Sequence, residues 1–206
     1  MTESDQPPGG PPTPGSGGPP RVAILLESDY FEPEIFYYQK RFAEAGFEVH
    51  FLSRLWGHDS LTFTGHEFQA PFTVQESLED LDGQRLGSFD ALIVPSGMVA
   101  DRLRYSETPT GIPPAAALLR RAFAEPAIVK GLICHGMWLL AKIPETVRGR
   151  PVTCHNNLVG DIGNMGARYV DADVVVDGDL VTGRTGEHCH LFARQLIDTV
   201  LEKRSA

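Results

Sequence analysis

The strongest candidate for chemistry is Cys134, which stands between an apolar run and a helical pattern. Residues 127–133 read AIVKGLI and predict a strand, whereas residues 135–142 read HGMWLLAK and predict a helix. A cysteine at such a strand-to-helix turn projects its thiol above the sheet, as nucleophiles do at sharp elbows. Gly136 lets the helix begin close to the strand, and the free amides and dipole of its first turn favour a thiolate. The sequence therefore predicts a reactive cysteine, with a buried structural thiol as the alternative.

The elements that must position this thiol alternate along the chain between apolar strands and amphipathic helices. Strands are predicted at 22–26, 47–52, 91–95 and 127–133, helices at 33–45, 115–124, 135–142 and 190–203, and a hairpin at 174–176 and 180–182. This alternation predicts an α/β fold with a mainly parallel sheet and helices on both faces. Ligands of such sheets bind beyond the carboxyl ends of the strands. The segments to consider are therefore 27–34, 96–101 and 134–135.

Composition limits the class of protein. The chain has 206 residues, of which 42% are hydrophobic and 22% charged, as expected of a globular domain. Its formal net charge of −9 opposes binding to phosphates, so we expect no nucleic-acid partner. No apolar run approaches the roughly 20 residues of a membrane span, so we expect no membrane partner. With three cysteines, an odd number, and no secretory signal, we expect a cytoplasmic protein.

The chain divides once by composition. Residues 1–20 hold seven prolines and five glycines, with no branched aliphatic or aromatic side chain. Such a segment cannot bury enough apolar surface to offset the entropy of ordering. We therefore expect a disordered tail over 1–20 and a single domain over 21–206.

Four segments of this domain resemble one known family. They are RVAILLESDYFEPEIFYYQKRFAEAGFEV, ALIVPSGMVADRLR, GLICHGMWLLA and VVVDGDLVTGR. Together they resemble the ThiJ/PfpI family, the superfamily of the parkinsonism-associated protein, which has a class I glutamine amidotransferase-like fold. The resemblance covers most of residues 21–203. It implies a flavodoxin-like three-layer α/β sandwich that forms homodimers or larger assemblies and needs no cofactor.

The resemblance also places the family's acid on Glu34, at the start of the first predicted helix. In the family this residue hydrogen-bonds the cysteine sulfur and is often protonated. Physical chemistry agrees, because burial and a neighbouring thiolate both raise the pKa of a carboxyl group. A neutral Glu34 is then a proton donor or general acid. The alternative is a carboxylate on a solvated turn that only complements the helix dipole.

Two histidines compete as the partner of Cys134. His135 matches the PfpI-like branch, where an acid from a neighbouring subunit orients the imidazole, and this acid falls on Asp101. His155 matches a histidine near the thiol in the parkinsonism-associated branch. Each histidine has a plain alternative as a polar residue without a catalytic role, and Asp101 has one as an ion-pair partner of nearby arginines.

The resemblance assigns two further groups at the strand ends. Ser96-Gly97 corresponds to a Gly-Gly pair in the family, and the Gly97 amide, with that of His135, is a candidate oxyanion hole. The segment Glu187-His188-Cys189-His190 precedes the last helix. We interpret His188 and His190 as substrate-binding residues, with polar capping of the helix as the alternative.

These residues also raise a metal and a redox hypothesis. Cys154-His155 and the 187–190 segment supply soft ligands of the kind that zinc takes. Neither a CxxC nor an HExxH spacing accompanies them. We therefore assign no metal ligands. In the redox hypothesis, Cys154 and Cys189 resolve an oxidised Cys134. The sequence alone does not place either of them within its reach.

Cysteine, carboxyl and imidazole groups together suit addition of a thiolate to an electrophilic carbonyl. We expect a cysteine-dependent enzyme acting on small carbonyl compounds, and the resemblance implies glyoxalase III or deglycase chemistry. The alternatives are a PfpI-like intracellular cysteine peptidase or amidase, and an isonitrile hydratase. A different class is a non-enzymatic redox sensor or chaperone, in which Cys134 is oxidised to a sulfinate.

Overall fold

A seven-stranded sheet forms the centre of the computed structural model, which describes residues 17–206. The strand order is β10-β11-β7-β6-β1-β2-β5, and every neighbouring pair is parallel except β10–β11. The strands are β1 (Arg21–Leu25), β2 (Glu48–Ser53), β5 (Glu76–Ser77), β6 (Ala91–Val94), β7 (Val129–Ile133), β10 (Val174–Asp177) and β11 (Leu180–Gly183). The predicted strands and the predicted hairpin all lie in this sheet, within two residues of the expected ends.

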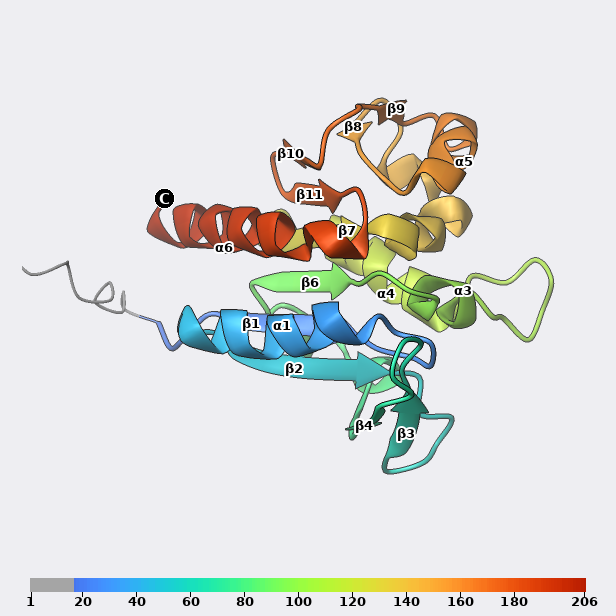
Figure 1. Cartoon of the computed structure of the whole chain (residues 1–206), viewed down its shortest axis with the longest axis vertical. Helices are drawn as coiled ribbons and strands as arrows, with labels where there is room; N and C mark the ends of the chain where they lie inside the picture. Colours follow the sequence, from blue (N-terminus) through green and yellow to red (C-terminus); the bar gives the residue numbers. More distant parts are fainter. Residues whose placement is uncertain (1–16) are drawn as a thin grey trace, which may run out of the picture.

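Helices cover both faces of the sheet (Figure 1). On one face, α1 (Glu32–Glu44) and α6 (Cys189–Ser205) lie side by side. On the other face lie α3 (Val99–Leu103), α4 (Pro114–Phe123) and the 3₁₀ helix η2 (Cys134–Lys142). All residues of β6 and β7 are buried, as expected of strands that are covered on both sides. The predicted three-layer, flavodoxin-like α/β sandwich is thus confirmed.

Shorter elements extend the ends of the sheet. They are the antiparallel pair β3 (Leu61–Thr64) and β4 (Pro71–Val74), the pair β8 (Pro151–Val152) and β9 (Arg168–Tyr169), helices α2 (Gly83–Leu86) and α5 (Val159–Asn164), and the 3₁₀ turns η1 (Leu78–Asp80), η3 (Pro144–Thr146), η4 (Asn156–Leu158) and η5 (Gly186–His188).

The segment after Cys134 differs from its prediction. A helix was expected at 135–142, and the structure forms a 3₁₀ helix of nine residues. Its buried positions recur at a spacing of three, as in Cys134, Met137 and Leu140. A 3₁₀ helix places such positions on one face, whereas an α-helix would rotate them apart.

Residues 18 and 20, which were assigned to the tail, already hydrogen-bond the domain. The backbone N–H of Glu48 donates to the carbonyl of Pro20 at 2.8 Å, and Arg204 donates to the carbonyl of Gly18 at 2.7 Å. The rest of the predicted tail, 1–16, lies outside the described residues. Over residues 17–206, no helix has both the length and the apolar character needed to cross a membrane.

Candidate active site

Cys134 occupies the elbow between β7 and η2 with a strained backbone. Ile133 is still extended, and Cys134 then takes a φ of +59°, in the left-handed region. A non-glycine residue seldom adopts this conformation, and such strain is concentrated at functional sites. Gly136 makes the tight start possible, because a Cβ on it would lie 2.5 Å from the carbonyl oxygen of Val94. The side chain is nearly buried, with 9% of the residue exposed.

Three backbone N–H groups from separate segments surround the sulfur of Cys134. They belong to His135, Gly97 and Gly186, and all three lower the pKa of the thiol by hydrogen bonding. Gly97 follows β6 with a φ of +77°, and a Cβ on it would lie 2.5 Å from the carbonyl oxygen of Asp29, so only glycine fits. The two amides predicted as an oxyanion hole therefore lie together at the sulfur. Gly186 was missed, although it follows β11, the next strand of the same parallel edge, and the rule of strand ends would have found it.

Glu34 lies at the start of α1 and is completely buried. Its Oε2 accepts hydrogen bonds from the backbone N–H of Ser96, at 3.0 Å, and from the Ser96 hydroxyl. Its Oε1 is buried and has no hydrogen-bond partner among residues 17–206. Burial raises the pKa of Glu34 to about 7, although the hydrogen bonds from Ser96 and the nearby Tyr38 hydroxyl lower it in part. The alternative of a carboxylate on a solvated turn is wrong.

The Cys134 thiol differs from the expectation of a lowered pKa. Burial, followed by the charge of Glu34, raises its pKa from 9.0 to about 11 against the pull of the three amides. Desolvation of the charged sulfur thus outweighs the backbone hydrogen bonds. Protonation of Glu34 removes the repulsion, so the thiolate forms most easily when the carboxyl is neutral.

His135 faces Asp101 within the same chain. Its Nδ1 lies 3.7 Å from Oδ2 of Asp101, too far for a hydrogen bond, and both atoms are buried without other partners in the described chain. Burial raises the pKa of Asp101, and the neighbouring charge of His135 lowers it in part. The packing of α3 on η2 brings the chain's own Asp101 to the imidazole. The contact with an acid of a neighbouring subunit stays a prediction.

His155 lies against His135 and caps the next 3₁₀ turn. Its Nδ1 accepts from the backbone N–H of Asn157 at 3.2 Å, and its ring meets that of His135 edge-on at 5.1 Å. Burial and the proximity of His135 lower the pKa of His155. Within residues 17–206, neither imidazole hydrogen-bonds the sulfur of Cys134.

His188 and His190 lie at the start of α6 and contact polar groups of neighbouring residues. His188 Nδ1 lies 2.7 Å from the Thr185 hydroxyl and its Nε2 lies 3.4 Å from Asp173, whereas the exposed His190 contacts the carbonyl of Glu187 at 3.2 Å. Neither contact caps α6, because the side chain of its N-cap residue His188 accepts from no helix N–H in the described chain. The substrate-binding role of the two histidines stays a prediction. Over residues 17–206, no three histidine, cysteine or acidic side chains gather in a way that would hold a metal ion.

The other two cysteines lie near the same groups. Burial raises the pKa of both Cys154 and Cys189 to about 12. The proximity of Cys134 adds to the shift of Cys154, and that of Glu34 adds to the shift of Cys189. Both are therefore neutral thiols beside the site.

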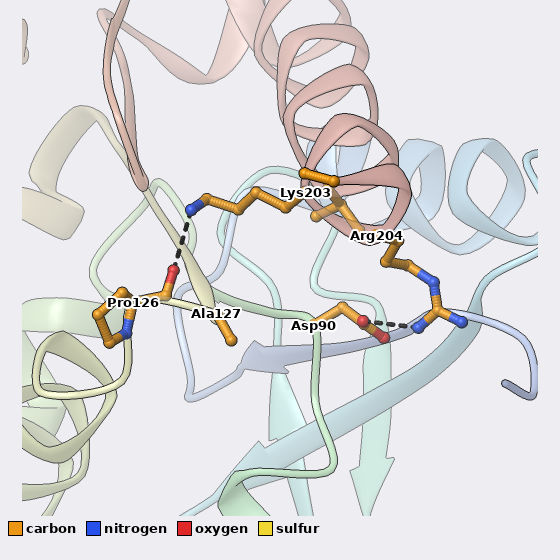
Figure 2. A pocket seen from close by; sticks show the side chains of 7 residues that line it. Asp90, Pro126, Ala127, Lys203 and Arg204 are labelled. Carbon is orange, nitrogen blue, oxygen red and sulfur yellow. Dashed lines mark hydrogen bonds and ion pairs between the residues drawn. The ribbon is translucent and has the colours of Figure 1, made fainter.

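Two hollows lie at the opposite end of the sheet, where the strands begin. One of about 360 Å³ is lined by residues that include Asp90, Ala127 and Arg204, and an adjoining one of about 390 Å³ reaches Gly17. Figure 2 shows Arg204 paired with Asp90 and Lys203 reaching the carbonyl of Pro126, at 2.7 and 3.0 Å. These contacts fasten the end of α6 to the sheet and lie away from Cys134.

Comparison with known proteins agrees with this architecture. Residues 20–199 match the model of the DJ-1/PfpI family. The chain is 30% identical to a deglycase of Pyrococcus horikoshii, over 86% of this chain and 97% of that protein. It is 29% identical to protein/nucleic acid deglycase 2 of Escherichia coli, over 86% and 95% of the two chains. A solved ThiJ/PfpI domain protein of Brachyspira murdochii superposes with a TM-score of 0.76 at 18% identity, over 90% and 99% of the two chains. The chain therefore belongs to the DJ-1/PfpI family.

Proposed function

We propose that this protein is a cysteine-dependent enzyme that acts on small carbonyl compounds, with deglycase or glyoxalase III chemistry. The observation that carries the proposal is the elbow thiol of Cys134, which has three backbone N–H groups at its sulfur and the buried Glu34 beside it. Two relatives named as deglycases, aligned over 86% of this chain, support the same class of substrate.

The chemistry begins with attack of Cys134 on an aldehyde. As the sulfur bonds to the carbonyl carbon of a 2-oxoaldehyde, its proton passes to Glu34, and the resulting oxyanion accepts from the backbone amides. Protonation of that oxygen gives a hemithioacetal. A base then moves the hydrogen of this carbon to the neighbouring carbonyl through an enediol, which yields a 2-hydroxy thioester. Water hydrolyses the thioester, so that one aldehyde and one water give one 2-hydroxy acid and the free thiol.

His135, supported by Asp101, is the base that this geometry favours. His135 directly follows Cys134 in the chain, and the Asp101 carboxyl lies 3.7 Å from Nδ1 of its imidazole. A carboxylate in that position stabilises the imidazolium that forms when the ring takes a proton. The ring of His155 packs edge-on against that of His135, and its Nδ1 accepts from a backbone amide.

The direct test is lactate formation from methylglyoxal by the wild type and by Cys134→Ser. We expect turnover by the wild type and a loss of at least about a thousandfold in the variant, because a hydroxyl is a far weaker nucleophile at neutral pH. Lactate formed equally by both proteins would remove Cys134 from the mechanism. Absence of turnover together with rapid conversion of Cys134 to a sulfinate by peroxide would support the redox-sensor alternative.

A second assay separates deglycase from glyoxalase action. A preformed methylglyoxal adduct of N-acetylcysteine is incubated with increasing enzyme. If the enzyme acts on the adduct itself, its loss rises in proportion to enzyme concentration. If the enzyme consumes only free aldehyde, the loss reaches a plateau at the spontaneous breakdown rate of the adduct.

Hydrolysis of amide bonds is a second candidate, favoured by the arrangement of Cys134, His135 and Asp101. Their residue types match the nucleophile, the base and the orienting acid of cysteine hydrolases. Release of a fluorescent amine from peptide amides, lost in Cys134→Ser, would support this candidate. An enzyme that forms lactate and cleaves no amide would exclude it.

A further inference from the structure

The buried Ser96 hydroxyl lies between two segments of the site and touches the acid rather than the nucleophile. Ser96 follows β6 and is 1% exposed. Its hydroxyl and its own backbone N–H both reach Oε2 of Glu34, so one carboxylate oxygen receives two donors and the other, Oε1, receives none in the described chain. Oε1 is thus the oxygen left to hold a proton.

The hydroxyl has little room to turn away. A Cβ on Gly186 would lie 2.5 Å from Ser96 Oγ and 2.6 Å from the ring of Phe31. The glycine at 186 therefore leaves the space that Ser96 fills, and the same glycine brings its N–H to the sulfur of Cys134. The packing of Gly186 and Phe31 around Ser96 therefore keeps its hydroxyl in contact with Glu34.

We propose that Ser96 is a positioning residue, which holds the Glu34 carboxylate through Oε2 and so sets whether the proton resides on Glu34 or on Cys134. The inference rests on the proposed function in that it concerns the same thiol and acid. The two groups exchange one proton without net gain or loss: a carboxylate and a thiol become a carboxylic acid and a thiolate.

The Ser96 hydroxyl favours the first of these two forms. A donor hydrogen bond to a carboxylate is stronger than one to a neutral carboxyl, so it stabilises ionised Glu34. The other titratable groups that face Glu34 are Tyr38, one turn along α1, Cys134 at the elbow, and Cys189 at the start of α6. None of them is a cation. No neighbouring positive charge in the described chain stabilises ionised Glu34, so the hydrogen bond from Ser96 does so. By favouring ionised Glu34, it disfavours the thiolate of Cys134.

The test is the alkylation rate of Cys134 by iodoacetamide between pH 5 and 10, followed by peptide mass spectrometry in the wild type and in Ser96→Ala. Loss of the hydroxyl destabilises ionised Glu34, so we expect the proton to move from sulfur to carboxyl. The rate near pH 8 should rise about tenfold, as for a shift of about one pH unit in the balance between the two groups. The carboxyl titration of Glu34, read by infrared difference spectroscopy, should move upward by about one pH unit.

Two variants control for packing. Ser96→Gly also lacks the hydroxyl and should shift the profile in the same direction, which keeps the test available if the alanine variant does not fold. Ser53→Ala removes another buried serine hydroxyl, at the end of β2, that has no hydrogen-bond partner in residues 17–206. It should leave the profile of Cys134 unchanged.

The outcomes separate this inference from the proposed function. Folded Ser96→Ala and Ser96→Gly with unaltered alkylation profiles would overturn the positioning role, even if the wild type forms lactate. A shift of equal size in Ser53→Ala would overturn it as well, because the effect would then be general loosening. Shifted profiles in a protein without turnover on any carbonyl would leave the positioning role standing and refute the enzymatic proposal.

Discussion

The two ends of the central sheet treat their buried polar groups in opposite ways. Where the strands begin, Lys130 is fully buried and paired with Asp179, which also binds Arg150 at 2.8 Å. Where the strands end, the polar atoms of Glu34 and His135 are buried with orphaned oxygen or nitrogen atoms in the described chain. Unpaired buried groups are costly and rare in native proteins. Buried charges are therefore paired where the strands begin, whereas unpaired buried atoms gather at the end of the sheet that carries Cys134.

The largest expected effect on stability comes from breaking the ion pair at the end where the strands begin. Asp179→Ala leaves Lys130 buried without its partner, and an uncompensated buried charge costs about 3–5 kcal/mol in the free energy of unfolding. Urea unfolding measures this loss. Lactate formation per folded molecule should be unchanged, because the pair lies away from Cys134. Asp173→Ala, at a half-exposed acid, is the control and should cost less than about 0.5 kcal/mol.

The next effect lies at the functional end and depends on pH. The folded-state pKa of Glu34 is raised from 4.5 to about 7, so the native chain holds a proton there that the unfolded chain has lost. Stability from this group is therefore full below about pH 4.5 and falls as pH rises through 7. Glu34→Gln does not titrate, so its stability relative to wild type should improve by about 3 kcal/mol from pH 4.5 to pH 8.

Urea unfolding of both proteins across that range gives the difference curve. A difference that stays flat with pH would contradict the burial of an ionisable Glu34. Control measurements with Glu79→Gln, a partly exposed acid paired with Arg54, should show no such trend.

A smaller effect concerns the orienting acid. Asp101→Asn keeps the size of the side chain and removes the charge that stabilises imidazolium at His135. We expect kcat for lactate formation to fall about tenfold with little change in KM, because the charge matters after substrate has bound. A fall in kcat/KM through KM alone would show that Asp101 shapes the binding site instead. Asp161→Asn, on α5, is a control outside the pair.

The smallest effect returns to the end where the strands begin. Arg204→Ala removes an ion pair with Asp90 in which both side chains are partly exposed, and pairs of this kind contribute about 0–1 kcal/mol. Thermal unfolding should register this small loss, reduced further in high salt. A loss above about 2 kcal/mol would mean that the hollow of Figure 2 depends on this arginine for its packing.

The strands and helices could be predicted because the local pattern of apolar residues indicates which positions are buried. Continuous apolar runs such as 22–26 and 127–133 become the strands that are covered on both faces. Cys134 and Glu34 could be found for the same reason, since each follows a predicted strand by a few residues. The rule that ligands bind at strand ends needs only the order of the elements.

Other features depend on contacts that no local pattern reveals. The hydrogen bonds of Ser96 to Glu34 join residues 62 positions apart. The direction of the Cys134 pKa shift was predicted wrongly because amides are visible in sequence, whereas the extent of desolvation is a property of the folded packing. The approach of Asp101 to His135 within one chain likewise depends on how α3 packs on η2.

The central claim is that Cys134 alone, among three thiols near the site, performs the reaction. Its most direct test is graded alkylation with iodoacetamide, with peptide mass spectrometry of each cysteine and the rate of lactate formation measured on the same samples. We predict a straight-line loss of activity that reaches zero at one label per chain on Cys134, while Cys154 and Cys189, whose pKa burial raises to about 12, stay unlabelled. Full labelling of Cys134 with lactate formation retained would contradict the account.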